Sequence, residues 1–255
     1  MNLNEKPSWS RNSLKKLGEA LVDEGDIPEG CPQYSEVMHW HNELASEVAS
    51  RIAEKAWITL APDNFDISAR PKTLDTLVQK LERETFSLAD VQDLSGVRID
   101  ADLTLTQQTQ LGHEVADHFG VTDNLVRDLR ENPHSGYRAV HLWLRCPAGR
   151  VEIQIRTVLQ SAWANVYERL GDFAGRGIRY GVEHDDPLVR DFVKEMHSMS
   201  KAIAEYEANL DDVRRKLQVE TGRGKLKRLR SQHEALLTPR AKILKDFDDV
   251  IRGLE

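Results

Sequence analysis

Polar side chains alternate with apolar ones in two neighbouring segments of the chain. The first segment is YRAVHLWLRC and the second, after the turn PAGR, is VEIQIRT. Because side chains along a strand point to opposite faces in turn, the apolar residues of this predicted hairpin share one face and the polar residues the other. The polar face carries Tyr137, His141, Glu152, Gln154 and Arg156. A merely solvated face usually carries Lys, Thr and Glu instead, so this set favours a binding or catalytic surface.

The charged residues in and before the hairpin are suited to phosphate chemistry. The candidates are the carboxylates of Asp93 and Glu152 and the cations of Arg70, Lys72, Lys80 and Arg156. Carboxylates bind Mg²⁺, and arginine and lysine neutralise phosphate charge. No GxxxxGK[ST] loop, kinase motif set or GxSxG motif is present. The set therefore indicates phosphoryl or pyrophosphoryl transfer, with an exposed tyrosine as a platform for a nucleobase.

Apolar periodicity predicts the elements that position these residues. Helical spacing predicts helices over 34–56, 73–83 and 105–119; strand patterns cover 94–103, 121–129 and the hairpin, and 57–72 is predicted to be extended. Residues 1–32 are predicted to form a polar leader. Because strands and helices interleave, we expect an α/β (α+β) fold, with a mixed β-sheet flanked by helices.

The last third of the chain is predicted to be a helical C-terminal extension, 181–255. A heptad pattern runs over 188–218. Its apolar stripe would be buried either in an intramolecular hairpin with 232–252 or in a homo-oligomer that forms through this helix. A basic segment, 214–230, follows. Its cations either form a solvated face or bind RNA, and the candidate RNA-binding residues are Arg214, Arg215, Lys216, Arg223, Lys225, Lys227, Arg228 and Arg230.

Composition excludes several classes of protein. The 255 residues carry a net charge of −7, so nucleic-acid binding by the whole surface is not expected. The chain has no apolar run long enough for a membrane span and no signal peptide, which predicts a cytoplasmic protein without membrane contacts. Cys31 and Cys146 are far apart and form no cluster, so neither a disulfide framework nor a zinc site is expected.

Four segments, in order, resemble the RelA/SpoT family of (p)ppGpp synthetases. They are RPKTLDTLVQKL (70–81), DLSGVRI (93–99), SGYRAVHLWL (135–144) and VEIQIRTVLQSAWA (151–164). The resemblance implies a nucleotidyltransferase-like synthetase domain over 33–180 and a small, single-domain alarmone synthetase. It implies transfer of the β,γ-pyrophosphate of ATP to the 3′-hydroxyl of GDP or GTP, with Mg²⁺. The family's hydrolase pattern is absent, so alarmone hydrolysis is not expected.

The resemblance also implies a role for each candidate residue. Arg70, Lys72 and Lys80 would bind the ATP phosphates, with Arg83 near the adenine. Asp93 and Glu152 would be the catalytic and metal-binding residues, with Glu152 either a ligand or a general base. The acceptor would be bound by Tyr137, Arg138, His141, Gln154 and Arg156.

Two departures from the family pattern leave the acceptor open. Pro133 stands where many alarmone-making members have lysine, and Ala139 where serine is usual. Both resemble the toxic small alarmone synthetases, some of which pyrophosphorylate the 3′-CCA end of tRNA, block translation and are paired with an antitoxin protein. A third alternative is an inactive nucleotide- or RNA-binding module, which retention of Asp93 and Glu152 disfavours.

Overall fold

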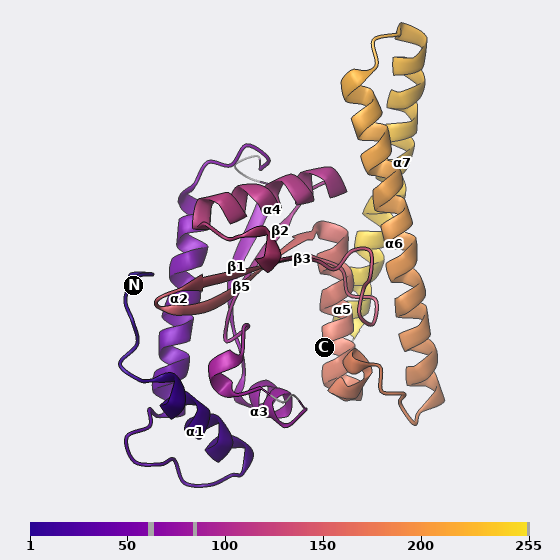
Figure 1. Ribbon diagram of the computed structural model, residues 1–255. Helices are drawn as coiled ribbons and strands as arrows, with labels where there is room; N and C mark the ends of the chain where they lie inside the picture. The colour runs from indigo at the N-terminus through magenta and orange to yellow at the C-terminus, as the bar shows by residue number, and fades with distance from the viewer. Residues whose placement is uncertain (61–63, 84–85, 254–255) are drawn as a thin grey trace. The chain divides into compact units, whose positions relative to one another are not determined.

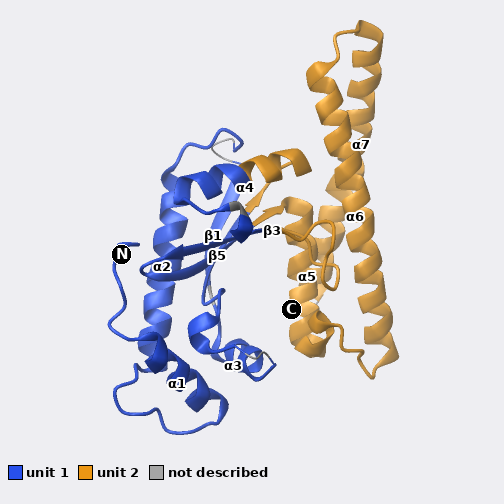
Figure 2. Ribbon diagram, in the orientation of Figure 1, with its two compact units in different colours: residues 1–99, 112–127, 141–154 blue, residues 100–111, 128–140, 155–255 orange. Residues whose placement is uncertain are grey.

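The computed structural model describes residues 1–60, 64–83 and 86–253. The chain divides into two compact units (Figure 2). Unit 1 comprises residues 1–99, 112–127 and 141–154; unit 2 comprises residues 100–111, 128–140 and 155–255.

A five-stranded sheet carries the predicted hairpin (Figure 1). Its strands are β1 (Phe65–Pro71), β2 (Ser95–Ala101), β3 (Val126–Asp128), β4 (Val140–Cys146) and β5 (Gly149–Thr157), in the order β1-β2-β5-β4-β3. β5 is the middle strand of this order, and its residues Val151, Ile153 and Ile155 are all fully buried, which matches the alternation in the sequence. The expected mixed sheet with flanking helices is confirmed.

Three helices and a short 3₁₀ turn pack together in unit 1. They are α1 (Arg11–Val22), α2 (Tyr34–Glu54), α3 (Leu74–Arg83) and η1 (Leu88–Asp90), while α4 (Leu105–Phe119) begins in unit 2 and ends in unit 1. Leu17 of α1 packs with Val37, Leu77 and Leu88 in one apolar cluster. Helix α1 lies inside the stretch expected to be only a polar leader. Its capping box, in which Ser10 and Ser13 bond each other's backbone, was the available signal.

Unit 2 contains α5 (Val158–Ala174), η3 (Arg176–Tyr180), α6 (Pro187–Val219) and α7 (Arg223–Gly253). The expected C-terminal helices are present as α6 and α7, which run side by side as a helical hairpin (Figure 1). Trp163 and Tyr167 of α5 form a buried core with Met196, Ile203 and Phe247 of these two helices. Among the described residues, no helix is both long and apolar enough to cross a bilayer.

Two predicted strands are shorter than expected. The strand predicted over 121–129 is only Val126–Asp128, because Leu125 N donates to Thr122 O and η2 (Asp123–Leu125) turns the chain first. The hairpin strand begins at Val140, so Tyr137 precedes it and does not lie on the strand face. Tyr137 N instead donates to His134 O at 3.0 Å. Within the stretch predicted to be extended, residues 61–63 lie outside the described residues.

His41 of α2 should make the stability of the protein depend on pH. The ring is buried, its Nδ1 lies 2.8 Å from Ser95 Oγ, and burial lowers the pKa of His41 to about 4. The unfolded chain, with a pKa of 6.5, therefore binds more protons between pH 6.5 and 4, and stability is lost as the pH falls through this window. Between pH 7.5 and 5.0 we expect the free energy of unfolding to drop by about 2 kcal/mol more in wild type than in His41→Gln.

Urea unfolding of both proteins at the two pH values measures this difference. An equal drop in wild type and His41→Gln would show that His41 does not stay neutral in the folded protein.

Candidate active site

Neighbouring strands of unit 1 bring together His141, Glu152 and Gln154. His141 Nδ1 on β4 lies 3.2 Å from Glu152 Oε1 on β5, and Gln154 Nε2 donates to Glu152 Oε2 at 2.7 Å. The polar face of the predicted hairpin is partly enclosed, because the side chains of His141 and Glu152 are only 11% and 14% exposed. Glu152 is therefore held by two neighbours in a sheltered position.

The Glu152 carboxyl is ionised at neutral pH. Burial alone would raise its pKa, but His141, the Gln154 hydrogen bond and the charge of Lys80 outweigh burial and lower the pKa to about 2. A carboxylate with so low a pKa holds protons weakly. It is therefore better suited to binding a cation than to accepting a proton at neutral pH.

A second carboxylate, Asp93, lies between two lysines in unit 1. Lys72 Nζ, just after β1, is 2.5 Å from Asp93 Oδ2, and Lys80 Nζ on α3 is 2.8 Å from Asp93 Oδ1. Burial raises the pKa of Asp93, yet Lys72 and Lys80 lower it further than burial and the charge of Glu152 raise it. Lys80 thus acts on both carboxylates, and the four charged groups form one electrostatic cluster.

The donor set of this cluster fits Mg²⁺ better than zinc. Within the described part of the chain, no three His, Cys, Asp or Glu side chains gather as a metal cluster, and both cysteines there are free. Mg²⁺, however, is commonly held by one or two carboxylates together with substrate phosphates and water. Asp93 and Glu152 supply two such carboxylates, both held in the ionised form.

The two remaining predicted ATP-binding residues lie on the surface of unit 1. Arg70 is on β1 and Arg83 is the last residue of α3, and both side chains are exposed. The Arg70 backbone also explains the glycine in DLSGVRI: a Cβ on Gly96 would lie 3.0 Å from Arg70 O. The close approach of β1 and β2 therefore favours glycine at this position.

In unit 2, Tyr137 and Arg156 contact each other. The guanidinium carbon of Arg156 lies 5.0 Å from the centre of the Tyr137 ring, a distance typical of a cation–π contact. Arg156 is 1% exposed. Burial lowers its pKa, but Tyr137, Asp100 and Glu168 together raise it above the usual value. Arg156 is therefore a buried, permanently charged support for the ring.

Arg138 contacts the protein interior of unit 2. Its Nη1 donates to Arg130 O, and its Nε donates to Ser200 Oγ on α6 at 3.2 Å. Arg138 thus hydrogen-bonds a residue of the C-terminal extension, a connection absent from the sequence prediction.

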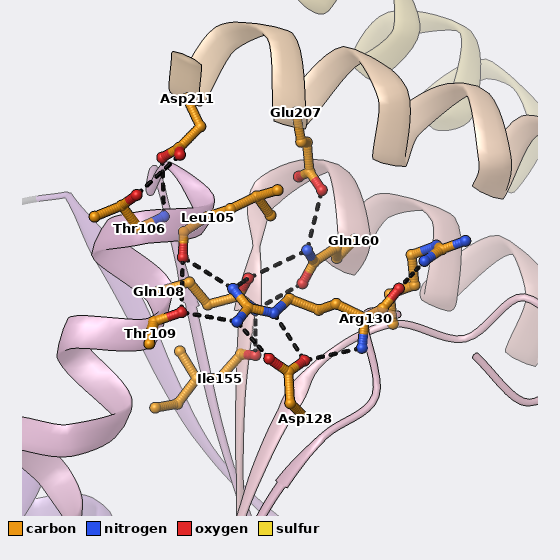
Figure 3. A network of polar contacts seen from close by, with 11 residues as sticks. Leu105, Thr106, Gln108, Thr109, Asp128, Arg130, Ile155, Gln160, Glu207 and Asp211 are labelled. Atoms are coloured by element: carbon orange, nitrogen blue, oxygen red, sulfur yellow. Dashed lines mark hydrogen bonds and ion pairs between the residues drawn. The ribbon is translucent and has the colours of Figure 1, made fainter. Parts of the chain in front are cut away.

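The sequence prediction missed a polar network in unit 2 that runs from exposed Asp128 to buried Gln160 and Glu207 (Figure 3). Arg130 donates hydrogen bonds to Asp128, Leu105 O, Gln108 and Thr109. The side chains of Gln108 and Gln160 hydrogen-bond each other. Glu207 of α6 accepts hydrogen bonds from Thr157 and Gln160. Burial raises the pKa of Glu207 despite these bonds. The members of the network come from strands, a loop and three helices that are far apart in the sequence, so no local sequence pattern marks them.

The structure separates the candidate RNA-binding residues into two groups. On α6, Arg215 and Lys216 pair with Asp212, and Arg214 Nε lies 3.1 Å from His233 Nε2. The other five are exposed on the first two turns of α7: Arg223, Lys225, Lys227, Arg228 and Arg230. Arg215 and Lys216 are exposed but paired with a carboxylate, whereas in this second group, the α7 basic group, Lys225 alone forms an ion pair among the described residues, with Glu220 at 3.8 Å.

A family and several relatives match the chain. The family model described as the region found in RelA / SpoT proteins matches residues 69–170. Uncharacterized proteins of Mycobacterium bovis and Mycobacterium tuberculosis are 54% identical over 181 residues, which is 71% of this chain. The match spans 65% of the length of these curated relatives.

Solved structures with the same fold were also found. The small alarmone synthetase 1 of Bacillus subtilis, bound to its product pppGpp, matches 73% of this chain and 99% of its own, with 18% identity and a TM-score of 0.56. A GTP pyrophosphokinase family protein of Streptococcus pneumoniae matches 74% of this chain and 98% of its own, with 15% identity and a TM-score of 0.52. At such low identity the likeness shows the fold.

Proposed function

We propose that this chain is a pyrophosphokinase that makes a (p)ppGpp-type alarmone, because residues 69–170 match the region found in RelA / SpoT proteins. It would transfer the β,γ-pyrophosphate of ATP to the 3′-hydroxyl of GDP or GTP. The observation that supports this most is the cluster of Lys72, Lys80, Asp93 and Glu152 in unit 1. It combines fixed cations with two ionised carboxylates, as pyrophosphate transfer requires.

On the donor side, Lys72 and Lys80 would pair with the phosphates of ATP in place of the Asp93 carboxylate. Lys72 and Lys80 now neutralise Asp93, and the phosphate oxygens of ATP would take over their ammonium groups. Arg70 would bind the same phosphates, and Arg83 would lie near the adenine. Asp93 and Glu152 would then hold Mg²⁺, which supplies positive charge to phosphate oxygens as they become more negative.

On the acceptor side, Tyr137 would stack on the base, with Arg156 supporting its ring. Arg138, His141 and Gln154 complete the proposed acceptor-binding set. In the transfer, the 3′-hydroxyl of the acceptor releases its proton to water, and O3′ forms a bond to the β-phosphorus of ATP. The bond from that phosphorus to the oxygen bridging the α- and β-phosphates breaks, and AMP leaves.

A second candidate keeps the donor chemistry and takes tRNA as the acceptor. The α7 basic group supports it, because clustered exposed cations bind a phosphate backbone with release of counterions. An enzyme of this kind would pyrophosphorylate the 3′-CCA end, block translation and have an antitoxin partner. Under either candidate we expect a cytoplasmic protein, and homo-oligomerisation through α6 stays a prediction.

The experiment follows label from γ-³²P ATP into GDP, GTP or deacylated tRNA, each with Mg²⁺ and with EDTA. We expect Mg²⁺-dependent label on a guanine nucleotide. Label on tRNA alone would replace the first candidate with the second, and changing all five residues of the α7 basic group to glutamine should then reduce labelling. If every acceptor stays unlabelled, the chain is a binding module rather than an enzyme.

A further inference from the structure

The segment from His134 to Ala139, here called the acceptor loop, has an unusual backbone. Ser135 and Gly136 both have positive φ, +49° and +84°. Glycine adopts this conformation easily, but serine does not, so neighbouring contacts must hold the loop in place.

Helix α6 supplies these contacts. Ser200 Oγ donates to Gly136 O at 2.5 Å and accepts from Arg138 Nε at 3.2 Å, so one hydroxyl bridges the residues on either side of Tyr137. Ser200 is 3% exposed, which shields both bonds from water. Two of the six loop residues, Gly136 and Arg138, are thus hydrogen-bonded to α6.

Helix α5 closes the other side of the loop within unit 2. A Cβ on Gly136 would lie 2.8 Å from Trp163 Cζ2 and 3.3 Å from Ser200 Cβ. Trp163 is fixed in turn, since its Nε1 donates to Met196 O of α6 at 2.7 Å. The loop backbone therefore has no room to shift toward either helix.

We propose that Ser200 is a positioning residue that holds the acceptor loop, and with it the Tyr137 ring, in the conformation that binds the acceptor. Ser200 lies outside residues 69–170, so this assigns part of the acceptor site to the C-terminal extension. The role in acceptor binding rests on the proposed function. Without the hydroxyl, Gly136 O and Arg138 Nε would lose a shared buried partner, and the loop would sample other conformations.

Two measurements on Ser200→Ala test this proposal. Hydrogen exchange of the amides of residues 135–139 should accelerate at least about tenfold, because the bond to Gly136 O is lost. In the transfer assay, the KM for the acceptor should rise about tenfold while the KM for ATP stays unchanged. Ser198→Ala is the matched control: this exposed hydroxyl on the same helix donates only to Lys194 O at 3.0 Å.

Unchanged exchange in the loop of Ser200→Ala would overturn the proposal, and so would an equal rise in both KM values. If wild type transfers no pyrophosphate to any acceptor, the proposed function fails. The exchange measurement would still decide whether Ser200 holds the loop, because it needs no substrate.

Discussion

Replacing Glu152 by glutamine should lower the rate of pyrophosphate transfer by about 10²–10³-fold, the range typical of losing one preorganised group that stabilises charge in the transition state. The amide keeps the shape of the side chain but removes the negative charge that His141 and Lys80 stabilise. Single-turnover transfer measures the rate. Binding of a non-hydrolysable ATP analogue should change far less, because Lys72 and Lys80 remain in place.

Glu82→Gln is the control for this substitution. Glu82 is an exposed residue of α3 in the same unit, and it belongs to no part of the proposed site. Its variant should transfer pyrophosphate at the wild-type rate. Full activity in Glu152→Gln would remove Glu152 from the mechanism.

The low pKa of Glu152 bears on how it acts. General bases work best when their pKa is close to the working pH, whereas the pKa of Glu152 is about 2. Its environment, with a histidine, an amide and a lysine directed at one carboxylate, stabilises the charged form. This favours a role for Glu152 in binding the metal and the acceptor hydroxyl over a role as the general base.

The sequence predicted the sheet and most helices well because their apolar patterns are regular. The apolar residues that alternate along β5 and recur at helical spacing along α2 and α6 are buried or partly buried in the structure. Helix α1 was missed because half of its residues are polar, and only Leu17 and Gly18 are buried. The start of β4 was misplaced because the turn at Ser135 and Gly136 depends on contacts with α6 that are distant in the sequence.

The candidate site was predictable in its residue types but not in its pairings. The matched motifs predicted Asp93 and Glu152 as the catalytic carboxylates. Nothing in the sequence, however, shows that Lys72 and Lys80 bind different oxygens of Asp93. The role of Ser200 was equally hidden. A single serine within a heptad pattern carries no signal until the acceptor loop is folded against it.

Replacing Asp93 by asparagine should raise the Mg²⁺ concentration needed for half-maximal transfer at least about tenfold. The substitution removes one of the two proposed carboxylate ligands and leaves Lys72 and Lys80 without their counterion. Calorimetric titration of an ATP analogue at several Mg²⁺ concentrations gives a second readout that needs no turnover. In this titration, Asp93→Asn should likewise need more Mg²⁺ than wild type to bind the ATP analogue.

Asp90→Asn is the matched control, because Asp90 is also a carboxylate held between two cations of unit 1, Arg11 at 2.6 Å and Arg150 at 3.4 Å. Both variants lose an ion-pair network, so a loss of stability alone would affect them alike. Only a metal-binding role predicts that the Mg²⁺ requirement rises in Asp93→Asn and stays at the wild-type value in Asp90→Asn. An identical Mg²⁺ dependence in the two variants would show that Asp93 does not bind the metal and is only an ion-pair partner of Lys72 and Lys80. Glu152 would then be the remaining carboxylate ligand.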